Sequence, residues 1–111
     1  MQPDFDWLES YPACVTICDR EANIIFMNQA SRQNFARHGG GDLIGQSLYA
    51  CHSIRSCELI REMLARQTGR TYLTARKGKK RLVHQAPWFR DGRFGGLVET
   101  IIDLEPDFQA P

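Results

Sequence analysis

The sequence predicts an α+β domain in which a five-stranded antiparallel sheet has its helices packed on one face. Three observations predict this fold. Two short β-branched segments lie close together near the N-terminus, an amphipathic helical segment occupies the middle, and three strand-like segments follow it. Strands that are joined by tight turns pair antiparallel, and we expect the intervening helices to cover one face of the sheet they form.

The first hairpin is predicted over residues 14–27. The segments CVTIC at 14–18 and IIFM at 24–27 contain the β-branched and aromatic residues typical of strands, and polar residues at 19–23 form the turn between them. Asn28 follows the second strand, and its side-chain oxygen suits the N-cap of a helix over 29–38. Three glycines at 39–41 end that helix.

The longest helix is predicted over residues 53–67, with Gly69 as its C-terminal stop. Before it, residues 42–48 indicate a short helical or irregular stretch. Four apolar residues of the long helix recur at i, i+3, i+6 and i+7, which places them on one face: Cys57, Ile60, Met63 and Leu64.

Three strands are predicted to complete the sheet, over residues 71–76, 81–89 and 95–104. Residues 77–80 form the first turn, and the Arg-Asp-Gly-Arg sequence at 90–93 is a strong hairpin signal. At the N-terminus, Asp4 suits the cap of a short helix whose apolar residues are Phe5, Trp7 and Leu8.

The composition is that of one globular domain. The chain has 111 residues, of which 42% are hydrophobic and 24% charged, and its net charge of +1 attracts neither nucleic acid nor an anionic membrane. No apolar run spans a bilayer and no signal peptide is present, so a cytoplasmic location is expected. In that compartment, the four cysteines are expected to be free thiols.

Three segments of the chain resemble the PAS domain family. They are DREANIIFMN at 19–28, DLIGQSL at 42–48, and the run from Asp91 to Asp103 that contains the last hairpin. They occur in the order and at the spacing of that family, and the resemblance extends over residues 11–104. It implies a domain over 11–105, preceded by a capping or dimerisation helix at 1–10 and followed by a short tail at 106–111.

The resemblance implies a five-stranded sheet with helices on one side, often around a small-molecule pocket. Members of the family sense a ligand, redox state or light, or pair with other PAS domains. Flavin photochemistry is not expected, because Leu48 stands where the family's photoactive members have a reactive cysteine. Cys51 and His52 lie where some haem-binding members place an axial ligand, so haem is retained as a minor alternative.

One pair of polar residues follows from the last hairpin. A turn centred on Asp91 and Gly92 places Arg90 opposite Arg93, and counting back along both strands places His84 opposite Glu99. By parity with the family, this face is the interior one, and it is shared by Leu82, Ala86, Trp88, Leu97 and Ile101. The pair is interpreted either as part of a ligand pocket or as a structural cross-strand contact.

No metal site is expected, because the spacings between the cysteines do not suit tetrahedral ligation. His38, beside the three glycines, is expected to be exposed and to have no role. The pocket candidates are His84, Glu99, Cys51, His52, Trp88, Tyr72, Met63 and Ile101.

The function predicted from these residues is a sensory module that binds an unknown small molecule and is not an enzyme. We expect it to form a homodimer through Phe5, Trp7 and Leu8. No output domain is expected in cis, so either it acts on a signalling protein in trans or it is a fragment of a longer protein. The basic residues at 77–81 are interpreted as a solvated turn and not as a nucleic-acid site. The alternative is a protein-interaction domain without ligand, whose large side chains fill its own core.

Overall fold

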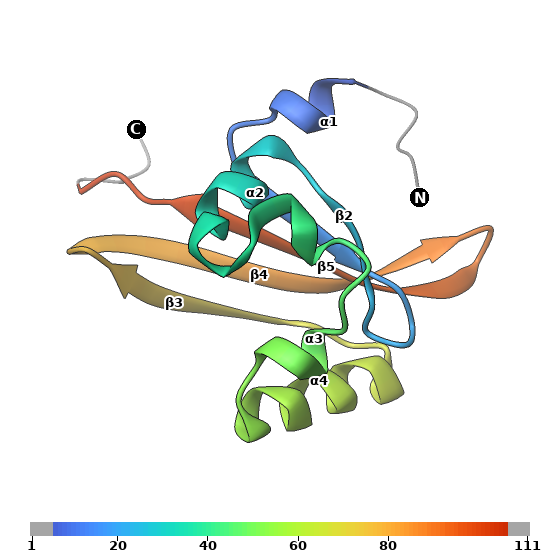
Figure 1. The fold of residues 1–111 in the computed structure, drawn as a ribbon. Helices are drawn as coiled ribbons and strands as arrows, with labels where there is room; N and C mark the ends of the chain where they lie inside the picture. The colour runs from blue at the N-terminus through green and yellow to red at the C-terminus, as the bar shows by residue number, and fades with distance from the viewer. Residues whose placement is uncertain (1–5, 107–111) are drawn as a thin grey trace.

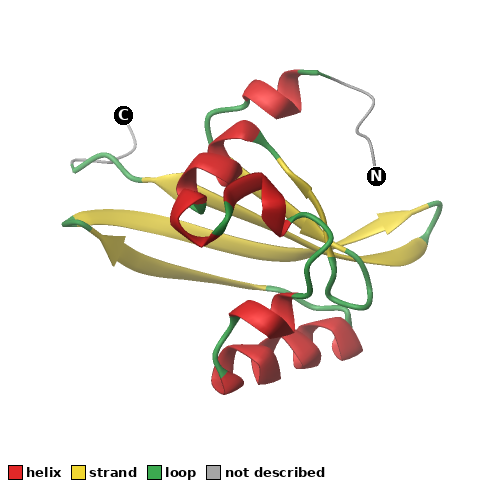
Figure 2. Cartoon of the chain, in the orientation of Figure 1, coloured by secondary structure: helices red, strands yellow, loops and turns green. Residues whose placement is uncertain are grey.

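Five antiparallel strands form a single sheet in the computed structural model, which describes residues 6–106. The order across the sheet is β2-β1-β5-β4-β3, so the first and last strands of the chain lie together at its centre. All helical segments except α1 lie in the chain between β2 and β3, as predicted, and Figure 2 shows them in red. The strands are β1 (Cys14–Cys18), β2 (Ile24–Met27), β3 (Arg70–Arg76), β4 (Lys79–Arg90) and β5 (Arg93–Asp103).

Six helical segments accompany the sheet within residues 6–106. In Figure 1, α2 and the two short helices after it lie across the sheet, whereas α3 and α4 lie together near the start of β3. Within residues 6–106, no helix is long and apolar enough to cross a bilayer. The segments are α1 (Trp7–Ser10), α2 (Gln29–Asn34), the 3₁₀ turns η1 (Ala36–His38) and η2 (Gly40–Leu43), α3 (Leu48–Cys51) and α4 (Ile54–Arg66).

The predicted helices and strands match the observed ones, and the differences lie at the ends of the elements. The helix predicted over 29–38 stops at Asn34 and continues as the 3₁₀ turn η1. The long helix ends at Arg66, and its C-cap residue Gln67 adopts the left-handed conformation with φ of 55°, so Gly69 is not the C-terminal stop that was predicted. Gly69 has another role, because a Cβ there would collide with the backbone of Gln85. The predicted cap Asp4 and the apolar Phe5 lie outside the described residues.

Asn28 joins the N-terminal segment, β1 and α2 through its fully buried side chain. Its Oδ1 accepts hydrogen bonds from the backbone N–H groups of Val15 and Ser31, at 2.9 and 3.0 Å, which confirms the predicted N-cap. Its Nδ2 donates to the carbonyl oxygens of Ala13 and Leu8, at 2.9 and 3.1 Å, and more weakly to that of Tyr11. One amide group therefore fixes where α1 enters the domain and where α2 begins.

The core on the inner face of the sheet has two separate clusters. One lies under α4 and the other under α2, and a row of polar residues crosses the sheet between them. The α4 cluster contains Cys18, Ala22, Ile60, Met63 and Leu97. The α2 cluster contains Cys14, Val83 and Ile101, with Ala30 and Phe35 packed against them.

A β-bulge in the last hairpin sets the register of its two strands. Arg90 pairs with Arg93 as predicted, but Phe89 pairs with Phe94 and Trp88 with Gly96, so Gly95 is an extra residue. A side chain at Gly95 would collide with the Trp88 ring, and one at Gly96 with the backbone of Cys18 and Asp19. Because side chains alternate between faces, this single extra residue reverses the predicted facing of β4 relative to β5.

The predicted set of inner-face residues is corrected accordingly. Leu97 and Ile101 do face the interior, but their partners across the ladder are Pro87 and Val83. Leu82 and Ala86, predicted to share their face, instead alternate with Val83 and Pro87 and lie on the outer face.

We predict that Asn28→Ala lowers the free energy of unfolding by about 2–4 kcal/mol, because it removes an N-cap and leaves buried backbone groups without partners. Chemical denaturation measures this change. The matched control is Gln33→Ala on the exposed side of α2, which should change stability by less than about 0.5 kcal/mol. Equal effects of the two substitutions would contradict the role assigned to Asn28.

Candidate functional site

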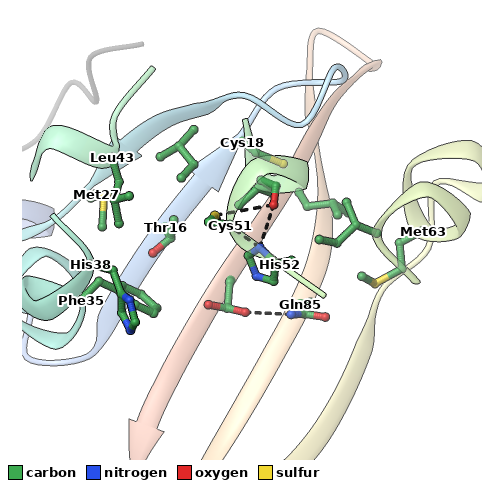
Figure 3. Close-up of a pocket in the computed structure, with 15 residues that line it drawn as sticks. Thr16, Cys18, Met27, Phe35, His38, Leu43, Cys51, His52, Met63 and Gln85 are labelled. Carbon is green, nitrogen blue, oxygen red and sulfur yellow. Dashed lines mark hydrogen bonds between the residues drawn. The ribbon is translucent and has the colours of Figure 1, made fainter. Parts of the chain in front are cut away.

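A cavity of about 230 Å³ lies between the inner face of the sheet and the helices. Figure 3 shows residues from both sides of it, with Phe35, His38 and Leu43 on one side and Met63 on the other. The cavity lies between the α2 cluster and the α4 cluster of the core. Its lining comprises Thr16, Cys18, Ile24, Met27, Phe35, His38, Leu43, Leu48, Cys51, His52, Ile60, Met63, Gln85, Leu97 and Glu99.

A polar row crosses the floor of the cavity. Register places Thr16 opposite Glu99, Glu99 opposite Gln85, and Gln85 opposite Arg70, so one residue from each of four adjacent strands lies in line. Gln85 Nε2 donates to Glu99 Oε2 at 2.7 Å, and Arg70 Nε donates to Gln85 Oε1 at 3.0 Å. We call Arg70, Gln85, Glu99 and Thr16 the polar row.

The polar row has defined donors and acceptors. Arg70 can only donate, so Gln85 must direct its oxygen to Arg70 and its amide N–H toward Glu99. At the other end, Thr16 Oγ1 lies 2.6 Å from Ser31 Oγ on α2. Glu99 is a half-buried carboxylate with one oxygen bonded to Gln85. The floor therefore offers an acceptor to a molecule in the cavity, surrounded by apolar side chains.

The mouth of the cavity carries two exposed histidines and an exposed thiol. His52 Nδ1 lies 2.8 Å from the carbonyl oxygen of Leu48, and that contact requires the proton on Nδ1. His52 Nε2 is therefore the acceptor nitrogen of the neutral ring. Cys51 Sγ lies 3.5 Å from His52 Nδ1 and also from the oxygen of Leu48 (Figure 3). His38 lies on the opposite side, at the end of η1.

Desolvation disfavours the thiolate form of the buried Cys14 and Cys18 and of the exposed Cys51. Desolvation raises the pKa of Cys18 to about 11 and also raises the pKa of Cys14 and Cys51. A thiolate is the reactive form of cysteine, so these groups are poor nucleophiles at neutral pH. Within residues 6–106, no group of three or more His, Cys, Asp or Glu side chains is placed to hold a metal ion.

The structure brings four of the predicted pocket residues to the cavity, namely Glu99, Cys51, His52 and Met63. The predicted pairing of His84 with Glu99 is wrong. His84 pairs with Thr100 on the outer face of the sheet, and its Nδ1 lies 2.7 Å from Thr71 Oγ1. The physical reason is the bulge at Gly95, which shifts the register by one residue and places Gln85 opposite Glu99.

Three further predicted residues lie outside the cavity lining. Trp88 packs over Gly95, and its Nε1 donates to the carbonyl oxygen of Cys18 at 2.9 Å. Tyr72 lies under the guanidinium of Arg70, and desolvation together with the Glu99 charge raises its pKa. Ile101 is in the α2 cluster of the core.

Sequence reasoning missed Gln85, Thr16 and His38. The signal for Gln85 and Thr16 was available only after the register was known, because each lies in the polar row by pairing across strands. His38 is exposed as predicted, yet it lines the cavity because the chain folds back through η1 and η2. The sequence contains no local signal for that turn beyond the three glycines.

The cavity is small for the cofactors considered. Sites for drug-sized ligands are about 300–1,000 Å³, whereas this one is about 230 Å³. A macrocycle the size of haem therefore does not fit between the two core clusters, although His52 has an acceptor nitrogen at the mouth. The residues fit a smaller molecule.

The comparisons with known proteins agree with the fold. A family model described as the PAS fold matches residues 8–105. No curated protein matches the sequence significantly. Among solved structures, a C-terminal domain from Streptococcus mutans is similar with a TM-score of 0.72 and 18% identity, covering 95% of this chain and 92% of that one.

Two other similar structures are receptors. The Aer2 receptor from Vibrio cholerae, described as a dual PAS-haem oxygen sensor, has a TM-score of 0.66 and 13% identity, with 84% of this chain and 95% of that chain covered. VqmA bound to DPO has a TM-score of 0.71 and 16% identity, with 90% and 55% covered. This chain thus spans about half of VqmA. At these identities, the likeness concerns the fold.

We predict that iodoacetamide at pH 8 modifies Cys51 in the folded protein well before Cys18. With a pKa of about 11, only about one Cys18 thiol in a thousand is ionised at that pH, and burial restricts access further. Peptide mass spectrometry measures the two rates. A Cys51→Ser variant should abolish the fast phase, and the Cys18 rate should rise as the pH approaches 11. Equal rates for Cys51 and Cys18 at pH 8 would contradict the described burial.

Proposed function

Because the chain belongs to the PAS fold family, whose members are typically sensory and signalling modules, we propose that it binds a small molecule in its cavity and passes on the occupied state by a change of shape or pairing. The observation that carries the proposal is the Gln85–Glu99 hydrogen bond on the floor of a mostly apolar cavity. Ligand sites commonly combine apolar walls with a few fixed polar groups.

The ligand is a compact molecule with an apolar body and a hydrogen-bond donor. Phe35, Met63 and Leu97 provide apolar surface, whereas the carboxylate of Glu99 needs a donor. An ammonium or hydroxyl group meets that need, and a carboxylate does not, because like charges in a partly buried site repel each other.

The polar row offers a route from the cavity to α1. The hydroxyl groups of Thr16 and Ser31 are hydrogen-bonded, and the backbone N–H of Ser31 donates to Asn28 Oδ1. Asn28 Nδ2 in turn donates to the carbonyl oxygen of Leu8 on α1. A ligand that binds one arrangement of this network better than another shifts the population toward it. The proposed output is binding, and the raised pKa values of Cys51 and Cys18 do not favour either thiol as a nucleophile.

Homodimerisation through α1 completes the proposed mechanism, and a signalling protein in trans is the recipient. Trp7 is 56% exposed and Leu8 is half-buried, so α1 presents apolar surface next to the Asn28 network. Phe5, the third residue predicted for this interface, lies outside the described residues. The alternative function is a ligand-free interaction domain, which the same fold would serve if the cavity stays empty.

We predict that benzylamine and benzyl alcohol bind the cavity and that benzoate does not. The three probes share a ring and differ in their head group. Titration followed by NMR at pH 8 should shift the side-chain amide signal of Gln85. Glu99→Gln should weaken benzylamine binding about tenfold or more, because it removes a charge-assisted hydrogen bond.

The matched control for Glu99→Gln is Asp103→Asn, which removes a negative charge from the same strand outside the cavity lining. It should leave benzylamine binding unchanged. Equal losses from the two variants, or tighter binding of benzoate, would contradict the proposed head group. No shift with any probe, together with no bound mass in native mass spectrometry of fresh protein, would favour the interaction-domain alternative.

We predict that the protein sediments as a dimer at about 50 µM and that Trp7→Ala weakens the dimer about tenfold or more, because exposed aromatic residues often dominate interfaces. Analytical ultracentrifugation measures both. The control is Ile54→Ala, which removes an apolar side chain that is 82% exposed on α4. A monomeric wild-type protein, or an equal effect of both variants, would refute this interface.

A further inference from the structure

The two edge strands of the sheet differ in whether other backbone groups pair with their outer side. At the β2 edge, the N–H of Ile24 donates to the oxygen of Gln46 at 2.9 Å, and the N–H of Gly45 donates to the oxygen of Ile24 at 2.7 Å. A bridge between Asn23 and Ser47 continues this cover. At the β3 edge, no strand or bridge within residues 6–106 pairs with the outer side, and every residue of β3 is exposed.

The outer edge of β3 is suited to pair with a strand of another chain. Its pairing with β4 runs without a bulge from Arg70 to Arg76, so the strand is regular over its whole length. Its central residues, Thr71 to Thr74, include strand-forming side chains and no proline, and Leu73 is 60% exposed. A long, regular strand with one unpaired side presents a row of backbone N–H and C=O groups to another chain.

The charges along this edge select the partner. β3, the turn after it and the first two residues of β4 include five cations and no acidic residue: Arg70, Arg76, Lys77, Lys79 and Lys80. None of these five cations forms a salt bridge with a residue of 6–106. Arg70 and Arg76 donate instead to the neutral groups of Gln85 and Asn34, so their charges are not neutralised.

We propose that the free edge of β3 binds an extended, acidic segment of a partner protein by strand addition. The backbone groups of the partner pair with β3, and its carboxylates face the cations at both ends of the strand. A second copy of this chain is disfavoured there, because two such edges would bring like charges together. Nucleic acid supplies negative charge but lacks the peptide groups that the edge requires.

The test uses the full chain and three fluorescent probes of comparable negative charge. The first is a nine-residue peptide that alternates glutamate with valine or threonine. The second has the same glutamates with prolines between them, so it cannot form a strand ladder. The third is an oligothymidylate. Fluorescence anisotropy should show at least tenfold tighter binding of the first, and hydrogen exchange should show protection of the β3 amides.

Two kinds of variant separate charge from strand pairing. Lys79→Glu with Lys80→Glu should weaken binding of the first peptide about tenfold or more, whereas the same charge change by Arg90→Glu with Arg93→Glu, in the other hairpin, should leave it within about twofold. Leu73→Pro and Thr74→Pro are both prepared, because N–H groups of adjacent strand residues point to opposite sides. The proline variant that keeps the native circular dichroism spectrum should not bind the first peptide.

Three results would overturn the proposal. They are equal binding of the proline-containing peptide, equal or tighter binding of the oligothymidylate, and absence of binding by the first peptide up to 1 mM. Each is independent of the cavity, so a loss of ligand binding in Glu99→Gln neither supports nor contradicts it.

Discussion

The arrangement of the domain depends on the buried amide of Asn28. Its oxygen is shared between the N–H groups of Val15 and Ser31, and its nitrogen holds the chain before β1. β1 lies between β2 and β5, so its position affects the whole sheet. Because α2 starts from the same amide, the helix that borders the cavity and the strand beneath it keep a fixed relation. In a low-dielectric interior, such a network is costly to leave partly satisfied.

Local signals predicted the elements well because each depends on neighbouring residues. Asn28 caps its helix as predicted, the long helix begins after Ser53 at the predicted start, and the first two strands have the predicted bounds of 14–18 and 24–27. The helix over 29–38 was overestimated because nothing local distinguishes α2 from the 3₁₀ turns that follow. The face of β4 was assigned wrongly, since one unpaired glycine reverses it.

The site was predictable only in part, for a related reason. Glu99 was selected through its predicted pairing with His84, which is wrong, but its assignment to the inner face by parity with the family agrees with the structure. Cys51 and His52 were selected from a family position, which did not depend on the pairing. Gln85 and Thr16 belong to the site through register across several strands. Trp88 was placed on the wrong face because the bulge at Gly95 reverses the facing of β4 relative to β5. Gly95 leaves room for the Trp88 ring, which lies outside the cavity lining.

The hydrogen bond from Arg70 to Gln85 means that part of the cavity's chemistry is decided at the surface. Arg70 is exposed and does not line the cavity, yet its guanidinium determines which end of the Gln85 amide meets Glu99. An acidic residue at position 70 would favour the opposite amide orientation and turn an oxygen toward the carboxylate. Selectivity in this fold can therefore diverge through residues that no bound molecule touches, so comparing only the cavity walls of two such domains would miss the cause.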